Sequence, residues 1–311
     1  MTLLYTSPIF LEHQTGAHPE RPLRLASIER RLAEAGLDAR CRRVGWSPAD
    51  TAQIERVHAP DYVALLRDYA ARGGGRIEAD TVVSERSFEA ATLAAGAVCD
   101  AVRRVTAGED RSALCLVRPP GHHALPTGAM GFCLLGNVAI GARHALAACG
   151  LDRVLIVDWD VHHGNGTQAM FWDDEQVAFL SIHRWPFYPG TGDRAETGAG
   201  PGLGYTVNLP IEFGTPLNAY HAQFEDSLAR LAAKVKPQLV IISAGFDAHR
   251  EDPIGSLELE AEDFARLTRS VLAIADQHCA GRVVSVLEGG YNPARLAESV
   301  EVHLAELLTA T

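Results

Sequence analysis

The sequence predicts an α/β protein built on a central, mostly parallel sheet with helices on both faces. Short apolar runs recur along the chain, and several are apolar almost throughout, as expected for parallel strands covered on both sides. From about residue 113 to the end, amphipathic helical segments alternate with these runs. This alternation is typical of a sheet packed between helices.

The apolar runs and the helical periodicity place the individual elements. Strands are predicted at residues 2–6, 113–117, 153–160, 177–182, 205–210, 238–244 and 282–288, and helices at residues 21–36, 87–105, 136–150, 215–235 and 259–278. Gly36 can end the first helix, and Thr215 followed by Pro216 is a typical helix start. The glycine-rich stretches 73–75 and 190–204 are predicted loops, and neither carries a phosphate-binding fingerprint.

Length and composition limit the function classes. The 311 residues, 47% of them hydrophobic, can form one large domain, and no linker or repeat divides residues 1–311. The net charge of −11 argues against nucleic-acid and anionic-membrane partners and is compatible with a cationic ligand. The six cysteines are scattered, which favours reduced thiols in a cytoplasmic protein. We find no signal peptide and no apolar run that could span a membrane.

The chemistry concentrates where predicted strands end. "DWDVHHGNG" begins at Asp158, and if the strand continues, Asp158, Asp160 and His162 share one side of it. Buried carboxylates must be paired or bound to a metal. Acids and an imidazole on one side therefore favour a metal site over a structural ion-pair network.

Three more strand ends carry reactive groups. They contribute the pair His122 and His123, then Asp247, then Tyr291. Sites in open parallel sheets form outside the carboxyl ends of the strands. Asp160, His162 and Asp247 would leave an open position for water, as in catalytic zinc sites, although Fe(II) or Co(II) could use the same ligands. The histidine pair and the tyrosine hydroxyl can serve as general base and oxyanion donor.

These motifs resemble the histone deacetylase family, including its bacterial acetoin-utilisation and acetylpolyamine relatives. The matching segments are "HPERPLRL", "RPPGHHA", "GFC", "DWDVHHGNGTQ", "GTGD", "SAGFDAH", "DPIG" and "EGGY". The resemblance is closest to the class II branch and implies the arginase/deacetylase fold, with a mostly parallel eight-stranded sheet. It implies zinc-dependent removal of an acetyl or other acyl group from an N-acylated amine, with acetyl-lysine in a protein or peptide as the expected substrate. In this resemblance Asp160, His162 and Asp247 match the zinc ligands.

The resemblance also assigns the residues around the metal. His122 and His123 match the family's tandem histidines, with His123 as the general acid/base. Tyr291 matches the tyrosine that binds the substrate carbonyl. Asp158 falls at the carboxylate that orients the first histidine, and Asn165 replaces the aspartate that class I members place behind the second.

Further assignments concern a monovalent ion and the acyl tunnel. The resemblance implies a structural potassium site formed by the Asp158 and Ser181 side chains and by the carbonyls of Asp160, His162 and Ile182. It places Gly131, Phe132 and Tyr188 along the tunnel, with Tyr188 where most lysine deacetylases have phenylalanine. Ile254 and Thr81 are expected at the rim. Acetylpolyamine-selective members carry glutamate at the position of Ile254, so the isoleucine favours a neutral or peptide substrate.

Three alternatives stay open at this stage. The first is an acetylpolyamine deacetylase. The second is a binuclear ureohydrolase of the same fold, which Asn165 and the single aspartate of "SAGFDAH" disfavour because two metals need more bridging carboxylates. The third is a binding protein for acyl-lysine without catalysis, which the presence of Tyr291 disfavours. The sequence does not define the oligomeric state or the physiological substrate.

Overall fold

The computed structural model, described for residues 1–309, contains a sheet of eight strands in which every neighbouring pair is parallel. This confirms the predicted fold class. The strands in spatial order are β2 (Arg42–Arg43), β1 (Leu3–Tyr5), β5 (Ser112–Cys115), β10 (Val283–Leu287), β9 (Leu239–Ala244), β6 (Val154–Asp158), β7 (Val177–Arg184) and β8 (Thr206–Ile211).

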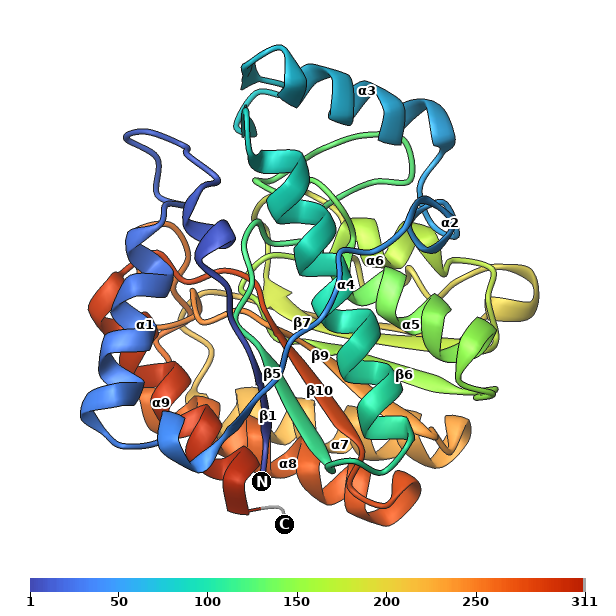
Figure 1. Ribbon diagram of the computed structural model, residues 1–311. Helices are drawn as coiled ribbons and strands as arrows, with labels where there is room; N and C mark the ends of the chain where they lie inside the picture. Colours follow the sequence, from blue (N-terminus) through green and yellow to red (C-terminus); the bar gives the residue numbers. More distant parts are fainter. Residues whose placement is uncertain (310–311) are drawn as a thin grey trace.

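Helices cover both faces of the sheet (Figure 1). One layer holds α1 (Leu23–Glu34), α9 (Pro293–Thr309), α8 (Ala261–Cys279) and α7 (Leu217–Val235), packed in that order. The other holds α4 (Ser87–Thr106) and α5 (Asn137–Ala148), with α2 (Thr51–Ile54), α3 (Pro60–Ala71) and α6 (Asn165–Met170) near them. The central strands β5, β6, β9 and β10 are buried along their whole length, so their near-continuous apolar sequence follows from coverage on both sides.

Several local features differ from the prediction. The glycine stretch 73–75 lies partly in β3 (Gly74–Arg76), which forms an antiparallel hairpin with β4 (Val82–Ser84). Thr215 does not cap α7: Pro216 occupies the cap position, and the Thr215 hydroxyl donates to the Glu212 carbonyl instead. Of the helices within residues 1–309, none combines the length and the apolar character that crossing a bilayer requires.

Candidate active site

The site lies at the carboxyl ends of four adjacent strands, β5, β10, β9 and β6. The loops that follow them carry, respectively, the pair His122 and His123, then Tyr291, then Asp247, then Asp160 with His162. Parallel neighbours deliver these side chains to one edge, as the sequence predicted. One detail differs, because β6 ends at Asp158. Asp160 and His162 therefore lie in the following loop and are oriented by its hydrogen bonds.

Asp160, His162 and Asp247 form a buried cluster whose ligand atoms all lie within 4.8 Å of one another. The Nδ1 atom of His162 is 3.0 Å from Oδ1 of Asp160 and 3.3 Å from Oδ2 of Asp247. Backbone N–H groups fix both acids: Val161 donates to Asp247 Oδ1 and Gly289 donates to Asp160 Oδ2. One nitrogen and two carboxylate oxygens are therefore held facing a common point.

The cluster fits a divalent cation. Asp247 Oδ2 is buried and accepts no hydrogen bond from the described residues, which is costly for a carboxylate oxygen unless a cation satisfies it. The Gly289 backbone packs against both acids, and a side chain there would collide with them, since a Cβ atom would lie 2.1 Å from Asp247 Oδ2 and 2.5 Å from Asp160 Oδ2. Two acids and one imidazole form a donor set suited to zinc and to other borderline divalent metals.

The two acids and the one imidazole of the cluster shift one another's pKa values. Burial, together with the charge of Asp160, raises the pKa of Asp247 to about 7. Burial alone would lower the pKa of His162, but the carboxylates of Asp160 and Asp247 raise it to about 9. The two acids thus stabilise positive charge at the Nδ1 nitrogen, which is the position a cation would share.

His123 is held as a neutral base. Its Nδ1 lies 2.7 Å from Oδ1 of Asn165, while the amide nitrogen of Asn165 faces the sulfur of Met130 at 3.3 Å. The amide oxygen can only accept, so Nδ1 carries the proton and Nε2 keeps its lone pair. Burial and the neighbouring His122 and His162 hold the pKa of His123 well below its usual value. This imidazole can accept a proton at neutral pH.

His122 has a different electrostatic environment. Its Nδ1 lies 3.0 Å from Oδ2 of Asp158, and its Nε2 lies 3.8 Å from Asp160 Oδ1. Burial opposes protonation, but the two carboxylates raise the pKa of His122 to about 10. Ser181 is in register with Asp158 on the neighbouring strand, and its hydroxyl lies 2.9 Å from Nδ1 of His183.

Tyr291 is anchored by groups that the sequence analysis did not single out. The carboxylate of Asp252 accepts the backbone N–H of Tyr291 at 2.6 Å through Oδ2, and the N–H of Ile254 at 2.9 Å through Oδ1. The Arg24 guanidinium lies 5.0 Å from the centre of the Tyr291 ring and donates to the carbonyls of Glu288 and Gly290. The Asp252 carboxylate therefore links the backbone of Tyr291 to that of Ile254, the predicted rim residue.

A cavity of about 200 Å³ leads to the cluster. Its lining residues are Asp80, His123, Gly131, Phe132, His162, Phe187, Tyr188, Ile254 and Tyr291. The predicted wall and rim residues Gly131, Phe132, Tyr188 and Ile254 are therefore brought together with the histidines and the tyrosine. Gly131 has a φ of +56°, and a Cβ there would lie 2.3 Å from the His123 ring, so glycine is required at this position.

The placement of Thr81 at the rim is wrong. Thr81 is fully buried; its hydroxyl donates to Asp80 Oδ1, and Oγ1 of Thr81 accepts the N–H of Phe132. Phe132 has a φ of 69°, so this bond supports the wall residue in a left-handed conformation. Asp80 takes the place at the cavity that was expected for Thr81.

Phe187 was also missed by the sequence analysis. Its ring is nearly parallel to His162, with centroids 5.3 Å apart, whereas Tyr188 meets His123 edge-on at 5.2 Å. The signals were present, because Phe187 and Asp80 are sequence neighbours of the residues that were named. Periodicity could not show that Phe187 lines the cavity beside Tyr188, or that Asp80 rather than Thr81 does.

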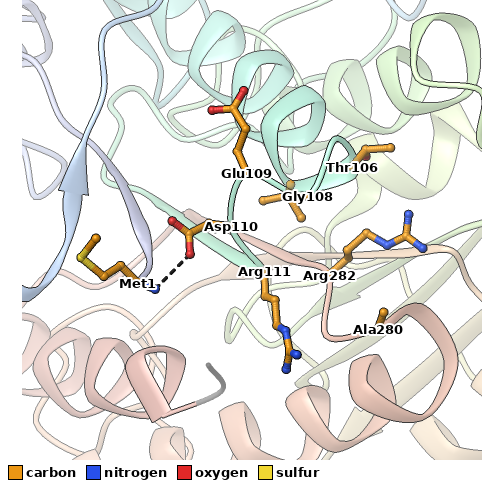
Figure 2. A pocket seen from close by; sticks show the side chains of 9 residues that line it. Met1, Thr106, Gly108, Glu109, Asp110, Arg111, Ala280 and Arg282 are labelled. Atoms are coloured by element: carbon orange, nitrogen blue, oxygen red, sulfur yellow. Dashed lines mark ion pairs between the residues drawn. The ribbon is translucent and has the colours of Figure 1, made fainter.

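Two further features of residues 1–309 resemble a binding site. Among residues 1–309, a second group of metal-ligand types comprises His122, Cys133 and Glu288, but backbone N–H groups of Gly121 and His122 already bind the Glu288 carboxylate. The larger hollow in Figure 2 lies at the amino ends of β5 and β10, away from the histidines. Its Arg111 and Arg282 side chains point in different directions, so they do not converge on one ligand.

A substrate carbonyl entering the cavity would meet acids, imidazoles and a phenol at its inner end, an arrangement suited to hydrolysis. Comparison with known proteins agrees: residues 18–307 match the histone deacetylase domain. A probable deacetylase of Archaeoglobus fulgidus is 42% identical over 286 residues, covering 91% of this chain and 79% of the relative. Human polyamine deacetylase HDAC10 is 43% identical over 302 residues, covering 93% of this chain but 44% of the human protein.

A solved structure supports the same relationship. The crystal structure of the HDA15 HD domain superposes with a TM-score of 0.92 at 36% identity, covering 99% of this chain and 88% of that one. The chain belongs to the histone deacetylase family. It is a hydrolase of amide bonds that acts as a deacetylase on acylated amines.

Proposed function

We propose that the chain is a zinc-dependent deacetylase whose main substrate is acetyl-lysine in a peptide or protein. The observation that carries this proposal is the buried convergence of Asp160, His162 and Asp247, with an unsatisfied carboxylate oxygen, at the inner end of a narrow cavity beside Tyr291. A cation held by these three residues would polarise the acyl carbonyl and lower the pKa of water, with Fe(II) or Co(II) as substitutes for zinc.

The surrounding side chains have separate parts in this proposal. Nε2 of His123 accepts a proton from the attacking water, because Asn165 holds the proton on Nδ1. The Tyr291 hydroxyl donates a hydrogen bond to the oxyanion of the tetrahedral intermediate. His122, hydrogen-bonded to Asp158, keeps positive charge near the site. A protonated imidazole of the tandem histidines His122 and His123 gives a proton to the leaving amine. Phe132, Phe187 and Tyr188 exclude water around the acyl chain.

A structural potassium ion is a further part of the proposal. Its ligands would be the Asp158 and Ser181 side chains and the carbonyls of Asp160, His162 and Ile182. Asp158 and Ser181 lie opposite each other on β6 and β7, which supports a shared ion there. We also propose that the protein works in the cytoplasm as a single catalytic domain.

Acetylpolyamine hydrolysis is the second candidate, and two observations favour it. The human relative is named a polyamine deacetylase, and the Asp80 carboxylate at the cavity could attract an ammonium group. Ile254 at the same cavity favours a neutral or peptide rim.

The test is acetate release from four substrates by zinc-loaded protein: an acetyl-lysine peptide, a long-acyl peptide, acetylputrescine and acetylspermidine. We expect the highest kcat/KM for the acetyl peptide. A higher value for either polyamine would favour the second candidate, and no acetate release from any of the four would refute both.

A further inference from the structure

A second hollow of about 440 Å³ is lined partly by residues that lie within two or three sequence positions of residues lining the acyl cavity, and we call it the side groove. Its lining includes Asp61, Tyr62, Leu65, Ile77, Glu78 and Ala129. Helix α3 supplies Asp61, Tyr62 and Leu65, whereas Ile77 and Glu78 belong to the β3–β4 hairpin and Ala129 to the loop before α5. The proposed reaction uses none of these residues.

The linings of the side groove and of the acyl cavity draw on the same two chain segments, residues 77–80 and 127–132. Glu78 lines the groove and Asp80 lines the cavity, and the backbone N–H of Asp80 donates to Glu78 Oε2 at 3.2 Å. In the loop before α5, Ala129 lines the groove and Gly131 lines the cavity. Side chains of an extended chain advance roughly 3.3–3.6 Å per residue, so a residue one or two positions from an acyl-lysine can reach the groove.

The groove has two chemical faces. Leu65 is 52% exposed, and Ile77 and Ala129 line the same groove, so one of its sides is apolar. The carboxylates of Asp61 and Glu78 have no ion-pair partner among the described residues. The nearby Arg76 donates to the Ala79 carbonyl rather than to either acid. An aliphatic stem that ends in a cation would match both faces, as lysine and arginine side chains do.

We infer that the side groove is a specificity subsite for a lysine or arginine that flanks the acyl-lysine in a peptide substrate. This inference rests on the proposed deacetylase function. Charge complementarity and the two chain segments that contribute to both linings support it. The subsite would favour basic segments of acetylated proteins, and it would act beside Asp80 and Ile254 of the acyl cavity.

The test compares acetyl-lysine peptides that carry arginine, or its uncharged isostere citrulline, one or two positions from the acetyl-lysine. We expect kcat/KM to be roughly threefold to tenfold higher for arginine, since each exposed ion pair contributes a modest attraction. Raising the salt concentration should reduce this ratio. The double variant Asp61→Asn with Glu78→Gln should bring it close to one.

Two controls separate this inference from the proposed function. Asp173→Asn removes an exposed carboxylate near the amino end of β7 and should leave the arginine preference intact. A capped acetyl-lysine without flanking residues should be hydrolysed equally by wild type and double variant, and its failure to react would count against the proposed function itself. An arginine preference that is absent in wild type, or that survives in the double variant, would overturn the subsite. Loss of acetylspermidine turnover alone in the double variant would also overturn it, in favour of a polyamine site.

Discussion

The Nδ1 atom of His123 lies 2.7 Å from the amide oxygen of Asn165. Asn165 places a neutral amide where class I members have a carboxylate. No negative charge next to Nδ1 therefore stabilises the protonated form of His123. Burial and the adjacent imidazoles keep its pKa low instead. The environment thus selects the tautomer of His123 without making it a strong base.

Asn165→Asp tests this relationship. A carboxylate at the same distance should stabilise the imidazolium and move the acidic limb of the kcat/KM profile to higher pH by about one to three units. Asn165→Leu should lower kcat without moving the limb upward, because it removes the orienting acceptor and adds no charge. Identical pH profiles for wild type and Asn165→Asp would show that this contact does not control the base.

Tyr291→Phe tests the oxyanion donor. Removing a single donor of this kind typically lowers kcat by about 10²–10³-fold. Zinc content and thermal stability should stay near wild type, because Asp252 holds Tyr291 through its backbone N–H. Turnover within a factor of about two of wild type, with metal bound, would exclude the hydroxyl from the reaction.

Asp252→Asn tests how Tyr291 is positioned. Asp252 uses one oxygen for the N–H groups of Ile254 and Gly255 and the other for those of Tyr291 and Asn292. An amide would turn its NH₂ toward one of these donor pairs. We expect the free energy of unfolding to fall by about 1–3 kcal/mol and kcat to fall roughly tenfold or more.

The matched control for Asp252→Asn is Glu251→Gln, which changes the neighbouring exposed carboxylate, paired with Arg295 at 3.0 Å. It should leave kcat unchanged. Equal effects of the two substitutions would show that charge loss, rather than the lost acceptor, is responsible.

His58 gives the protein an acid-sensitive support. Its Nε2 accepts the N–H of Gly136 at 2.9 Å, and its Nδ1 lies 3.1 Å from the Leu125 carbonyl, so it ties both ends of the loop that carries Gly131 and Phe132. Burial lowers the pKa of His58 to about 4 from 6.5. The unfolded chain therefore binds more protons than the folded chain between these pH values, and stability is lost as pH falls through that window.

His58→Gln should reduce this acid sensitivity. The contribution of His58 is fully present above pH 6.5 and decreases by on the order of 3 kcal/mol toward pH 4. The measurement is the difference in unfolding free energy between wild type and variant across this range, which cancels the effect of other buried histidines. Parallel stability curves would contradict the assignment.

The fold was predictable because parallel strands buried on both faces leave an unmistakable apolar signature, as in β6 and β9. The short edge strand β2 and the β3–β4 hairpin carry no such signature, because few of their side chains are buried. Thr215 followed by Pro216 predicted the amino-terminal cap of α7. The prediction failed because the Thr215 hydroxyl donates to the Glu212 carbonyl in the preceding turn instead.

The convergence of the cluster was predictable for a related reason. Asp160, His162 and Asp247 follow strands whose order the α/β pattern largely determines, so their meeting point is a property of topology. Asp80, Phe187 and Asp252 depend on loop conformations that no periodicity encodes. In such loops, the conformation determines which of two sequence neighbours is buried and which lines the site. Thr81, for example, is buried and donates to Asp80, which lines the cavity.

The cation is the centre of the proposed chemistry, and metal reconstitution tests it most directly. Protein stripped with a chelator is titrated with zinc. Acetate release from an acetyl-lysine peptide and the amount of bound zinc are measured at each step. The variant Asp247→Asn, which lacks the charge of one ligand, is treated in the same way. We expect wild-type activity to rise from near zero and level off at about one zinc per chain, with Asp247→Asn binding zinc more weakly. Full activity in stripped protein that contains no measurable divalent metal would contradict the account.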